Sequence, residues 1–384
     1  MCMQNKEQLI QLCQNLVQHP SLSGLEDQVA SFIVNEMHRL KFDEVFVDDF
    51  GSVTGSIFGT ENGPSILFDG HIDTVGVEDS SLWSHEPFEG TLIEGRIYGR
   101  GTSDMKGALA AMIKAAADFK KKTDGNFSGS IHVSCTVCEE CFEGVSAALI
   151  TSRIKPDMVV VGEASSLSIK RGQRGRAEIV LKTSGKSCHS SNPQKGVNAI
   201  TAMLTVLPQI LQIQAPNHPV LGEGILVVTD IKSFPYPGKS VIPDSCKVTF
   251  DRRVLPEETE ESILDPIKQI LTQHPDIEAS VAIAEESLQL YTGKVIKAKR
   301  FFPAWILEED HPLVIAAKEA LPEASLSHYS FCTNASHFAA EAKIPCIGYG
   351  PSEETLAHTV DEYIEVDQLI GAYEGYLSLL EQLL

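Results

Sequence analysis

The segment SILFDGHIDTV, residues 65–75, joins a short apolar run to two polar side chains, His71 and Asp73. A short apolar run of this kind is typical of a strand buried on both faces, as in a parallel sheet covered by helices. In such sheets, ligands bind beyond the carboxyl ends of the strands. The segment therefore predicts an α/β fold in which His71 and Asp73 lie at the ligand-binding edge of the sheet.

Helical and strand-like patterns alternate on both sides of this segment. Apolar residues recur at helical spacing in four segments, at 9–17, 29–40, 104–120 and 142–151. Strand-like runs occur at 44–47, 52–58, 65–69, 131–137 and 158–161. Ser23 and Glu26 match a capping box at the start of the second helix. The alternation predicts a mixed, mostly parallel sheet covered by helices.

The chain is long enough for two domains. Its 384 residues exceed the roughly 250–300 at which a single hydrophobic core stops growing. From Gly175 onward, alternating polar strands and two helical patterns predict an inserted α+β domain at 175–286. A strand-like run at 344–348 and a closing helix at 366–383 indicate a return to the first sheet. We therefore expect a catalytic domain made of 1–174 and 287–384.

The composition excludes several classes of partner. Lys and Arg total 31 against 52 Asp and Glu, a formal net charge of -21, which disfavours nucleic acid and anionic lipid. The chain lacks an uncharged apolar run of the roughly 18–20 residues that a membrane span requires. Its start, MCMQNKEQ, does not resemble a secretion signal, and its nine cysteines are an odd number. These features predict a reduced, cytoplasmic protein.

Two further segments carry acidic residues at the ends of predicted elements. In GRGTSDMKG, residues 99–107, Asp104 follows a glycine-rich turn at the start of a helix. The spacing does not fit a phosphate-binding loop, which leaves a helix cap or a metal-binding carboxylate as interpretations of Asp104. In TVCEECFEG, residues 136–144, Glu139 and Glu140 are adjacent at the end of a strand. The CxxC pair in this segment has neither a second pair nor a thioredoxin-like context, so redox or zinc-finger chemistry is disfavoured.

Glu163 follows the buried run VVVG, and His358 lies in LAHTVDEYI shortly before the closing helix. The five segments, in this order, resemble the M20 family of zinc-dependent peptidases and deacylases, which includes succinyl-diaminopimelate desuccinylase, acetylornithine deacetylase, aminoacylase and carboxypeptidase G. The resemblance extends over nearly the whole chain. The segments RGQRGRAEI, DSCKVTFDRR and FCTN look closest to the YgeY-type branch of that family.

The resemblance implies a dinuclear metal centre. Two Zn²⁺ per subunit would be held by His71, Asp104, Glu140, Glu163 and His358. Asp104 would bridge the two ions, with His71 and Glu163 completing one site and the other two residues completing the second. Asp73 would orient His71, and Glu139 would act as the general base. Co²⁺ and Mn²⁺ also fit a site of imidazoles and carboxylates.

The resemblance also implies roles outside the metal ligands. The inserted domain would be a lid that provides a homodimer interface. His189 would stabilise the oxyanion, and Arg253 would bind a substrate carboxylate, whereas Arg252 points to the opposite strand face. Thr333 and Asn334 replace the Ser/Thr-Asp that many members carry in a substrate-binding loop, so they are expected to contact the substrate.

Together these features predict a dinuclear zinc-dependent amide hydrolase that cleaves an N-acyl amino acid or short peptide with a free carboxylate. An aminopeptidase or dipeptidase of the same family is an alternative. A non-catalytic binding protein on a decayed hydrolase scaffold is a second alternative, but such a protein should have lost a metal ligand or the base. All six of these positions carry the required residue types.

Overall fold

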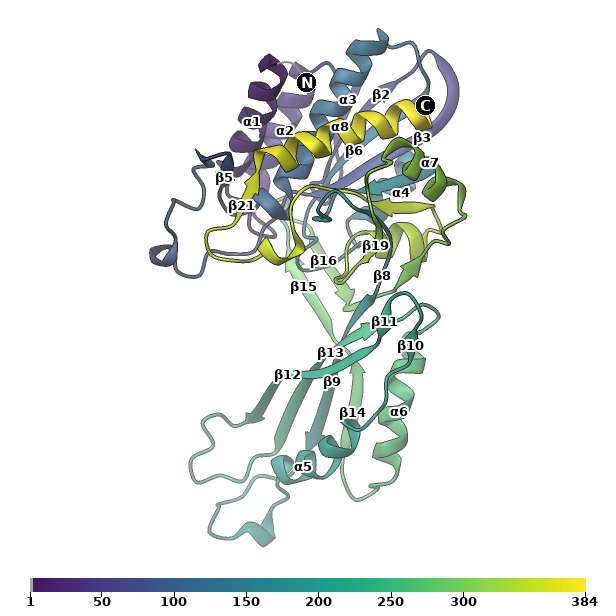
Figure 1. The fold of residues 1–384 in the computed structure, drawn as a ribbon. Coiled ribbons are helices and arrows are strands. Elements are labelled where there is room, and N and C mark those ends of the chain that lie inside the picture. The colour runs from purple at the N-terminus through teal and green to yellow at the C-terminus, as the bar shows by residue number, and fades with distance from the viewer. Residues whose placement is uncertain (1–2) are drawn as a thin grey trace. The chain divides into compact units, whose positions relative to one another are not determined.

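The computed structural model describes residues 3–384, which form two compact units (Figure 1). The first unit contains the residues up to Gln173 together with Ser287–Ile296 and Ile306–Leu384, and the second contains Arg174–Glu286 and Lys297–Trp305. The sequence prediction assigned all of 287–384 to the first domain. Residues Lys297–Trp305 instead belong to the second unit, because β17 (Phe301–Phe302) pairs with β9 (Gly175–Ser184).

A nine-stranded sheet forms the centre of the first unit. The order of its strands is β1 (Glu44–Val47), β2 (Val53–Phe58), β6 (Ser128–Thr136), β3 (Glu61–His71), β7 (Met158–Val161), β20 (Cys346–Gly348), β8 (Ile169–Gln173) and β18 (Trp305–Ile306), and β19 (Leu326–Tyr329) pairs with β8. Strand β3 runs parallel to both β6 and β7, and β20 runs parallel to β7. Because β1, β2 and β6 pair in antiparallel fashion, the sheet is mixed, as predicted.

The helices of the first unit are α1 (Met3–Val17), α2 (Asp27–Arg39), α3 (Gly107–Thr123), α4 (Ala147–Ile154), α7 (Pro312–Ala320) and α8 (Val366–Leu383). Helix α8 lies beside α3 (Figure 1), and its Tyr376 packs edge-on against Phe68 of β3 with ring centroids 5.4 Å apart. Gly70 leaves room for Met105 and Leu109 on this same face, where any Cβ would overlap them. Side chains alternate along a strand, so Asp69 points to the opposite face.

Three local predictions differ from the structure. Glu26 occupies the N-cap position of α2 but makes no side-chain capping bond there, so the predicted capping box is wrong. The side chain of Ser23 instead donates to Asp73. Helix α4 begins at Ala147 rather than 142, because the preceding residues form turns. Helix α3 begins at Gly107, and Asp104 lies before it in a non-helical backbone conformation.

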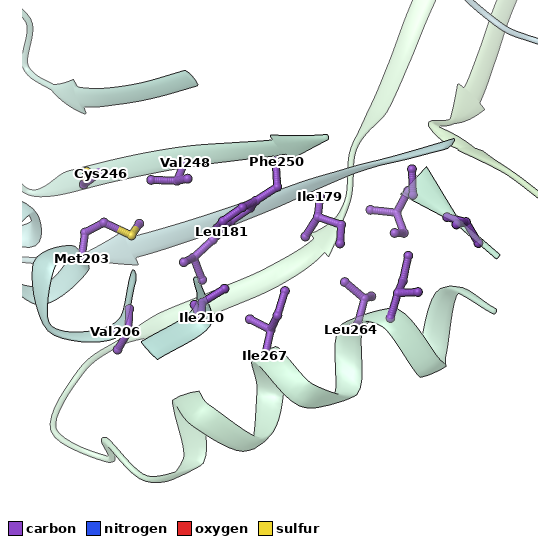
Figure 2. Packing of buried hydrophobic residues seen from close by; sticks show 14 of the residues in the cluster. Ile179, Leu181, Met203, Val206, Ile210, Cys246, Val248, Phe250, Leu264 and Ile267 are labelled. Carbon is purple, nitrogen blue, oxygen red and sulfur yellow. The ribbon is translucent and has the colours of Figure 1, made fainter. Parts of the chain in front are cut away.

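The second unit has its own hydrophobic core, which Figure 2 shows from close by. Its sheet has the order β12 (Ile225–Phe234), β13 (Ser245–Val254), β9 and β14 (Ala279–Ile283). Helices α5 (Ala199–Ile210) and α6 (Glu260–Thr272) pack against it. Alternate residues of the strands, such as Leu181 and Phe250, meet Ile267 and its neighbours in the core.

Smaller sheets complete the fold. They are the three-stranded sheet of β21 (Tyr363–Glu365), β5 (Arg96–Tyr98) and β4 (Thr91–Ile93), and the pairs β15 (Glu285–Gln289) with β16 (Val295–Lys299) and β10 (Asn217–His218) with β11 (Gly222–Glu223). Among residues 3–384, no helix has the length and apolar character needed to cross a bilayer.

Candidate metal centre

Three neighbouring strands deliver polar side chains to one edge of the first unit's sheet. His71 is the last residue of β3, and it lies in register with Thr136, the last residue of β6. Glu139 and Glu140 follow β6, and Glu163 follows β7, which also runs parallel to β3. Because the carboxyl ends of parallel strands meet at the same edge, these residues converge although they are far apart in sequence.

Asp104 lies between two imidazoles. His71 Nε2 donates to Asp104 Oδ1 over 2.8 Å, and His358 Nε2 lies 3.2 Å from Asp104 Oδ2. His358 Nε2 also lies 3.0 Å from Oε2 of Glu140. Each oxygen of the Asp104 carboxylate therefore faces a different imidazole, and one of these imidazoles also contacts a second carboxylate.

Glu163 approaches the same ring nitrogen of His71 that faces Asp104. Its Oε1 is 3.6 Å from His71 Nε2, and its side chain is 4% exposed. Within the described part of the chain, the only groups of possible metal ligands with atoms within 4.8 Å of one another are His71–Asp104–Glu140 and His71–Glu139–Glu163. The five predicted ligands thus lie together, and Glu139 lies with them.

The protonation states reflect this crowding of charges. Burial raises the pKa of Glu163 well above its ordinary value, and the nearby Asp104 raises it further. Hydrogen bonds to Asp104 and Glu140 raise the pKa of His358 to about 10. Burial opposes the charged form of His71, but its hydrogen bond to Asp104 raises its pKa well above the ordinary value. Protons on the two imidazoles thus balance part of the carboxylate charge.

The donor set fits divalent cations. Two imidazoles and three carboxylates, with a fourth carboxyl group alongside, are the ligands that Zn²⁺, Co²⁺ and Mn²⁺ use in proteins. Cations at this position would neutralise the carboxylates and displace the imidazole protons.

Glu139 is buried and points its carboxyl group into the cluster. The residue is 6% exposed, and its Oε1 has no hydrogen-bond partner among residues 3–384. Burial raises its pKa well above the ordinary value, and the nearby Glu163 adds to the rise, whereas His71 opposes it. A carboxyl group with an unused oxygen beside a metal site is suited to proton transfer.

Asp73 acts on two parts of the cluster through different atoms. His71 Nδ1 donates to the main-chain carbonyl of Asp73 over 2.8 Å, whereas the Asp73 carboxylate is 3.6 Å from this nitrogen. The carboxylate instead accepts the main-chain N–H groups of Glu139 and Glu140 at 3.0 and 3.2 Å. Asp73 orients His71 through its backbone, and its side chain holds the turn that carries the two glutamates.

Sequence reasoning missed Glu362 and Arg100, which position the Asp104 turn. Glu362 is fully buried and accepts from Arg100 Nη1 over 2.6 Å. Its other oxygen accepts the main-chain N–H groups of Ser103 and Asp104 at 2.8 and 3.2 Å. The only sequence signal is an acidic residue four positions after His358. That signal does not identify the distant turn to which it binds.

The predicted substrate contacts Thr333 and Asn334 are used within the protein. Both are buried, at 0% and 2% exposure. The Asn334 amide donates to Asp69 and to Thr136, and its oxygen accepts the N–H of Gly144. Both polar atoms of the amide therefore have protein partners. Asn334 forms a buried bridge in this structure, and its contact with substrate stays a prediction.

Thr333 likewise faces the interior. Its hydroxyl donates to the side chain of Gln173 over 2.7 Å and accepts the N–H of Ala335 over 3.1 Å. Thr333 is 0% exposed and its hydroxyl has two protein partners, so its contact with substrate also stays a prediction.

His189 and Arg253 lie in the second unit. His189 is exposed, and its Nδ1 contacts Ser191 Oγ over 2.7 Å. Arg253 Nε lies 3.0 Å from Asp251 Oδ1, whereas Arg252 binds Glu258 over 2.6 Å. The two neighbouring arginines thus have different partners, as the alternation of side chains along a strand predicts.

Comparisons with known proteins identify the family of this chain. The chain matches peptidase family M20/M25/M40 over residues 67–382 and belongs to this family of hydrolases, whose members act on peptide or amide bonds and bind divalent metals. The uncharacterised protein YgeY of Escherichia coli K12 is 34% identical over 376 residues, covering 95% of this chain and 92% of YgeY.

Solved structures share the fold at low sequence identity. Aminopeptidase PepT of Bacillus cereus superposes with a TM-score of 0.75 at 22% identity, covering 98% of each chain. The M20 family metallo-carboxypeptidase Sso-CP2 of Sulfolobus solfataricus gives a TM-score of 0.74 at 16% identity, again with 98% of each chain. At these identities the likeness concerns the fold alone.

Proposed function

We propose that this chain is a dinuclear metal-dependent amide hydrolase that cleaves an N-acyl amino acid or a short peptide with a free carboxylate. The observation that carries the proposal is the position of Asp104, whose two oxygens face His71 and His358 at 2.8 and 3.2 Å. A carboxylate shared in this way between two imidazoles suits a bridge between two cations.

In this proposal, His71, Glu163 and Asp104 would hold one ion, and Asp104, Glu140 and His358 would hold the other. Zn²⁺ is the expected metal, and Co²⁺ or Mn²⁺ suits the same donors. Bound ions would supply Lewis acidity, which polarises the scissile carbonyl and lowers the pKa of water at the site. His71 Nδ1 would keep its proton and donate it to the Asp73 carbonyl, which leaves Nε2 as the ligand atom.

Glu139 is the proposed general base. Its carboxylate takes a proton from the attacking water, the water oxygen bonds to the carbonyl carbon, and the carbon–nitrogen bond then breaks. The same proton passes from Glu139 to the leaving nitrogen, so the products are a carboxylic acid and an amine. The buried, unpartnered Oε1 of Glu139 supports this role.

The second unit would complete the substrate site and the assembly. Arg253 would bind the free carboxylate and His189 the oxyanion. A homodimer formed through this unit is supported by β12, an edge strand whose Val227, Ile231 and Phe234 are 47%, 52% and 66% exposed. We place the protein in the cytoplasm on the basis of its sequence.

A substrate panel tests the proposal. N-acetyl, N-succinyl and N-carbamoyl amino acids, dipeptides and amino acid amides would be assayed for amine release after chelation, with and without added Zn²⁺. Release from N-acyl substrates that is restored by Zn²⁺ is expected. Cleavage only of substrates with a free α-amino group would establish the aminopeptidase or dipeptidase alternative. Metal binding without any cleavage across the panel would count against catalysis on these substrates and favour a binding protein.

A further inference from the structure

Two buried carboxyl groups bind three successive main-chain N–H groups of the turn after β6. Cys138 N donates to Glu26 Oε1 over 3.3 Å. Glu139 N and Glu140 N donate to the two oxygens of Asp73, at 3.0 and 3.2 Å. Hydrogen bonds to a carboxyl group are among the stronger ones in proteins. The backbone of the proposed base is therefore held from outside the ligand set.

The segment before α2 is tied to both carboxyl groups. Ser23 Oγ donates to Asp73 Oδ2 over 2.7 Å, and the N–H of Gly24 donates to Glu26 Oε1 over 2.9 Å. The thiol of Cys138 also contacts this oxygen, at 3.4 Å. The side chains of Ser23 and Glu26 thus bind groups connected with the turn after β6 and do not cap the helix.

Glu26 is costly to bury. The residue is 0% exposed, its Oε2 has no hydrogen-bond partner within residues 3–384, and it makes no capping bond to α2. Burial, followed by the charge of Asp73, raises its pKa to about 7. Cys138 has φ 60°, a left-handed conformation that is unfavourable for a residue with a Cβ. The hydrogen bond that the Cys138 N–H donates to Glu26 is in a position to hold this conformation.

We propose that Glu26 and Ser23 are positioning residues that fix the turn of residues 138–140, and with it the direction of the Glu139 carboxylate. The inference rests on the proposed function of Glu139. In this inference, the segment before α2 affects catalysis by positioning Glu139, without contacting substrate or metal.

The test uses Glu26→Ala, Glu26→Gln and Ser23→Ala in the full-length, Zn²⁺-loaded protein. Glu26→Ala should lower kcat by about 10- to 100-fold, the usual cost of losing an outer-shell partner, with KM and bound Zn²⁺ nearly unchanged. Glu26→Gln retains an acceptor oxygen, and its NH₂ group replaces an oxygen without a partner, so this variant should stay close to the parent. Ser23→Ala should lower kcat less than Glu26→Ala does.

A second readout requires no turnover. Amide hydrogen exchange of the peptide that contains residues 138–140 should accelerate in Glu26→Ala and not in Glu26→Gln. Asp157→Ala is a matched control, because Asp157 Oδ2 accepts the N–H of Ser65 in β3 of the same unit, six residues before His71. Asp157→Ala should lower the unfolding midpoint without faster exchange at 138–140.

Unchanged kcat in both Glu26→Ala and Ser23→Ala would overturn the proposal. Equal rates of amide hydrogen exchange at residues 138–140 in Glu26→Ala and the parent would also overturn it. Equal decreases of kcat in Glu26→Ala and Glu26→Gln would do the same. If Glu26→Ala does not fold, the kcat and exchange of Ser23→Ala decide the matter. If the parent hydrolyses nothing, the exchange comparison still tests the positioning of the turn, and the proposed function alone fails.

Discussion

Replacing Asn334 by Asp tests whether this residue is a buried bridge. The Asn334 amide nitrogen lies 3.0 Å from Asp69 Oδ2, in a region where both residues are almost fully buried. The substitution changes a donor into an acceptor and places two carboxyl groups in contact. Either both ionise and repel each other, or one of them keeps a proton.

The distances give the size of the effect. Two unit charges 3.0 Å apart repel by about 5–6 kcal/mol at an effective dielectric constant of about 20. Protonating one carboxyl group with an ordinary pKa near 4 costs about 4 kcal/mol at pH 7. Protonation is the cheaper outcome, so Asn334→Asp should lower the free energy of unfolding by about 4 kcal/mol at pH 7.

The pH dependence follows from the retained proton. Burial raises the pKa of Asp69 to about 6, so the parent has lost this proton above pH 6. Above pH 6 the native variant binds one proton more than the native parent does. The free energy of unfolding of the variant should therefore decrease with rising pH by about 1.4 kcal/mol per pH unit more than that of the parent. Urea unfolding of chelated protein at pH 6, 7 and 8 measures this slope.

Two companion variants make the result specific. Asn334→Ala removes the same hydrogen bonds without adding a charge. Because the Asn334 amide lowers the pKa of Asp69, the loss of stability in Asn334→Ala should depend on pH only near the Asp69 pKa, with a smaller additional slope than that of Asn334→Asp. The exchange Asp69→Asn with Asn334→Asp restores an amide opposite a carboxylate and should recover most of the stability. A variant Asn334→Asp with the parent's pH slope, or a double variant no more stable than Asn334→Asp, would refute the bridging role.

Four further outcomes are expected. Glu139→Gln should abolish turnover while bound metal stays the same by elemental analysis; simultaneous loss of metal would contradict its role as base. Zn²⁺ binding should release protons, because the pKa of His71 is raised and that of His358 is raised to about 10, so that the metal displaces a proton from each imidazole. Calorimetry in buffers of different ionisation enthalpy measures the number of protons released, and a value of zero would contradict this expectation. Arg253→Ala should raise KM for carboxylate-bearing substrates more than for neutral amides, and equal effects on the two would exclude a carboxylate contact. His189→Ala should lower kcat in a steady-state assay, whereas an unchanged kcat would rule out an oxyanion role.

Several residues of the candidate metal centre could be predicted from the sequence because the ends of buried strands have a recognisable pattern. An apolar run followed by a polar residue marks the end of a buried strand, and parallel strands place such ends at one edge. His71, Glu140 and Glu163 could be predicted together on this basis. For Asp104 the local pattern left a helix cap or a metal ligand open, and the family resemblance connected Asp104 and His358 with these three residues. Both lie in turns whose conformation the local pattern does not determine.

What the sequence could not predict depends on contacts between distant segments. The predicted capping box of Ser23 and Glu26 has the right residues, but Asp73 and Cys138 provide alternative partners that local spacing does not show. Glu362 holds the turn of Asp104 from the other end of the chain. The resemblance predicts a substrate contact for Asn334, but the pattern of its loop does not show that Asp69 lies opposite.

The most direct test of the account combines metal content with hydrolysis in one titration. The chelated protein would be titrated with Zn²⁺ while bound metal and amine release from an N-acyl amino acid are measured at each step. We expect no hydrolysis in the chelated protein, binding of two Zn²⁺ per chain, and activity that rises with occupancy and is absent in Glu139→Gln. Hydrolysis that persists after complete chelation, or a Glu139→Gln variant as active as the parent, would contradict the account.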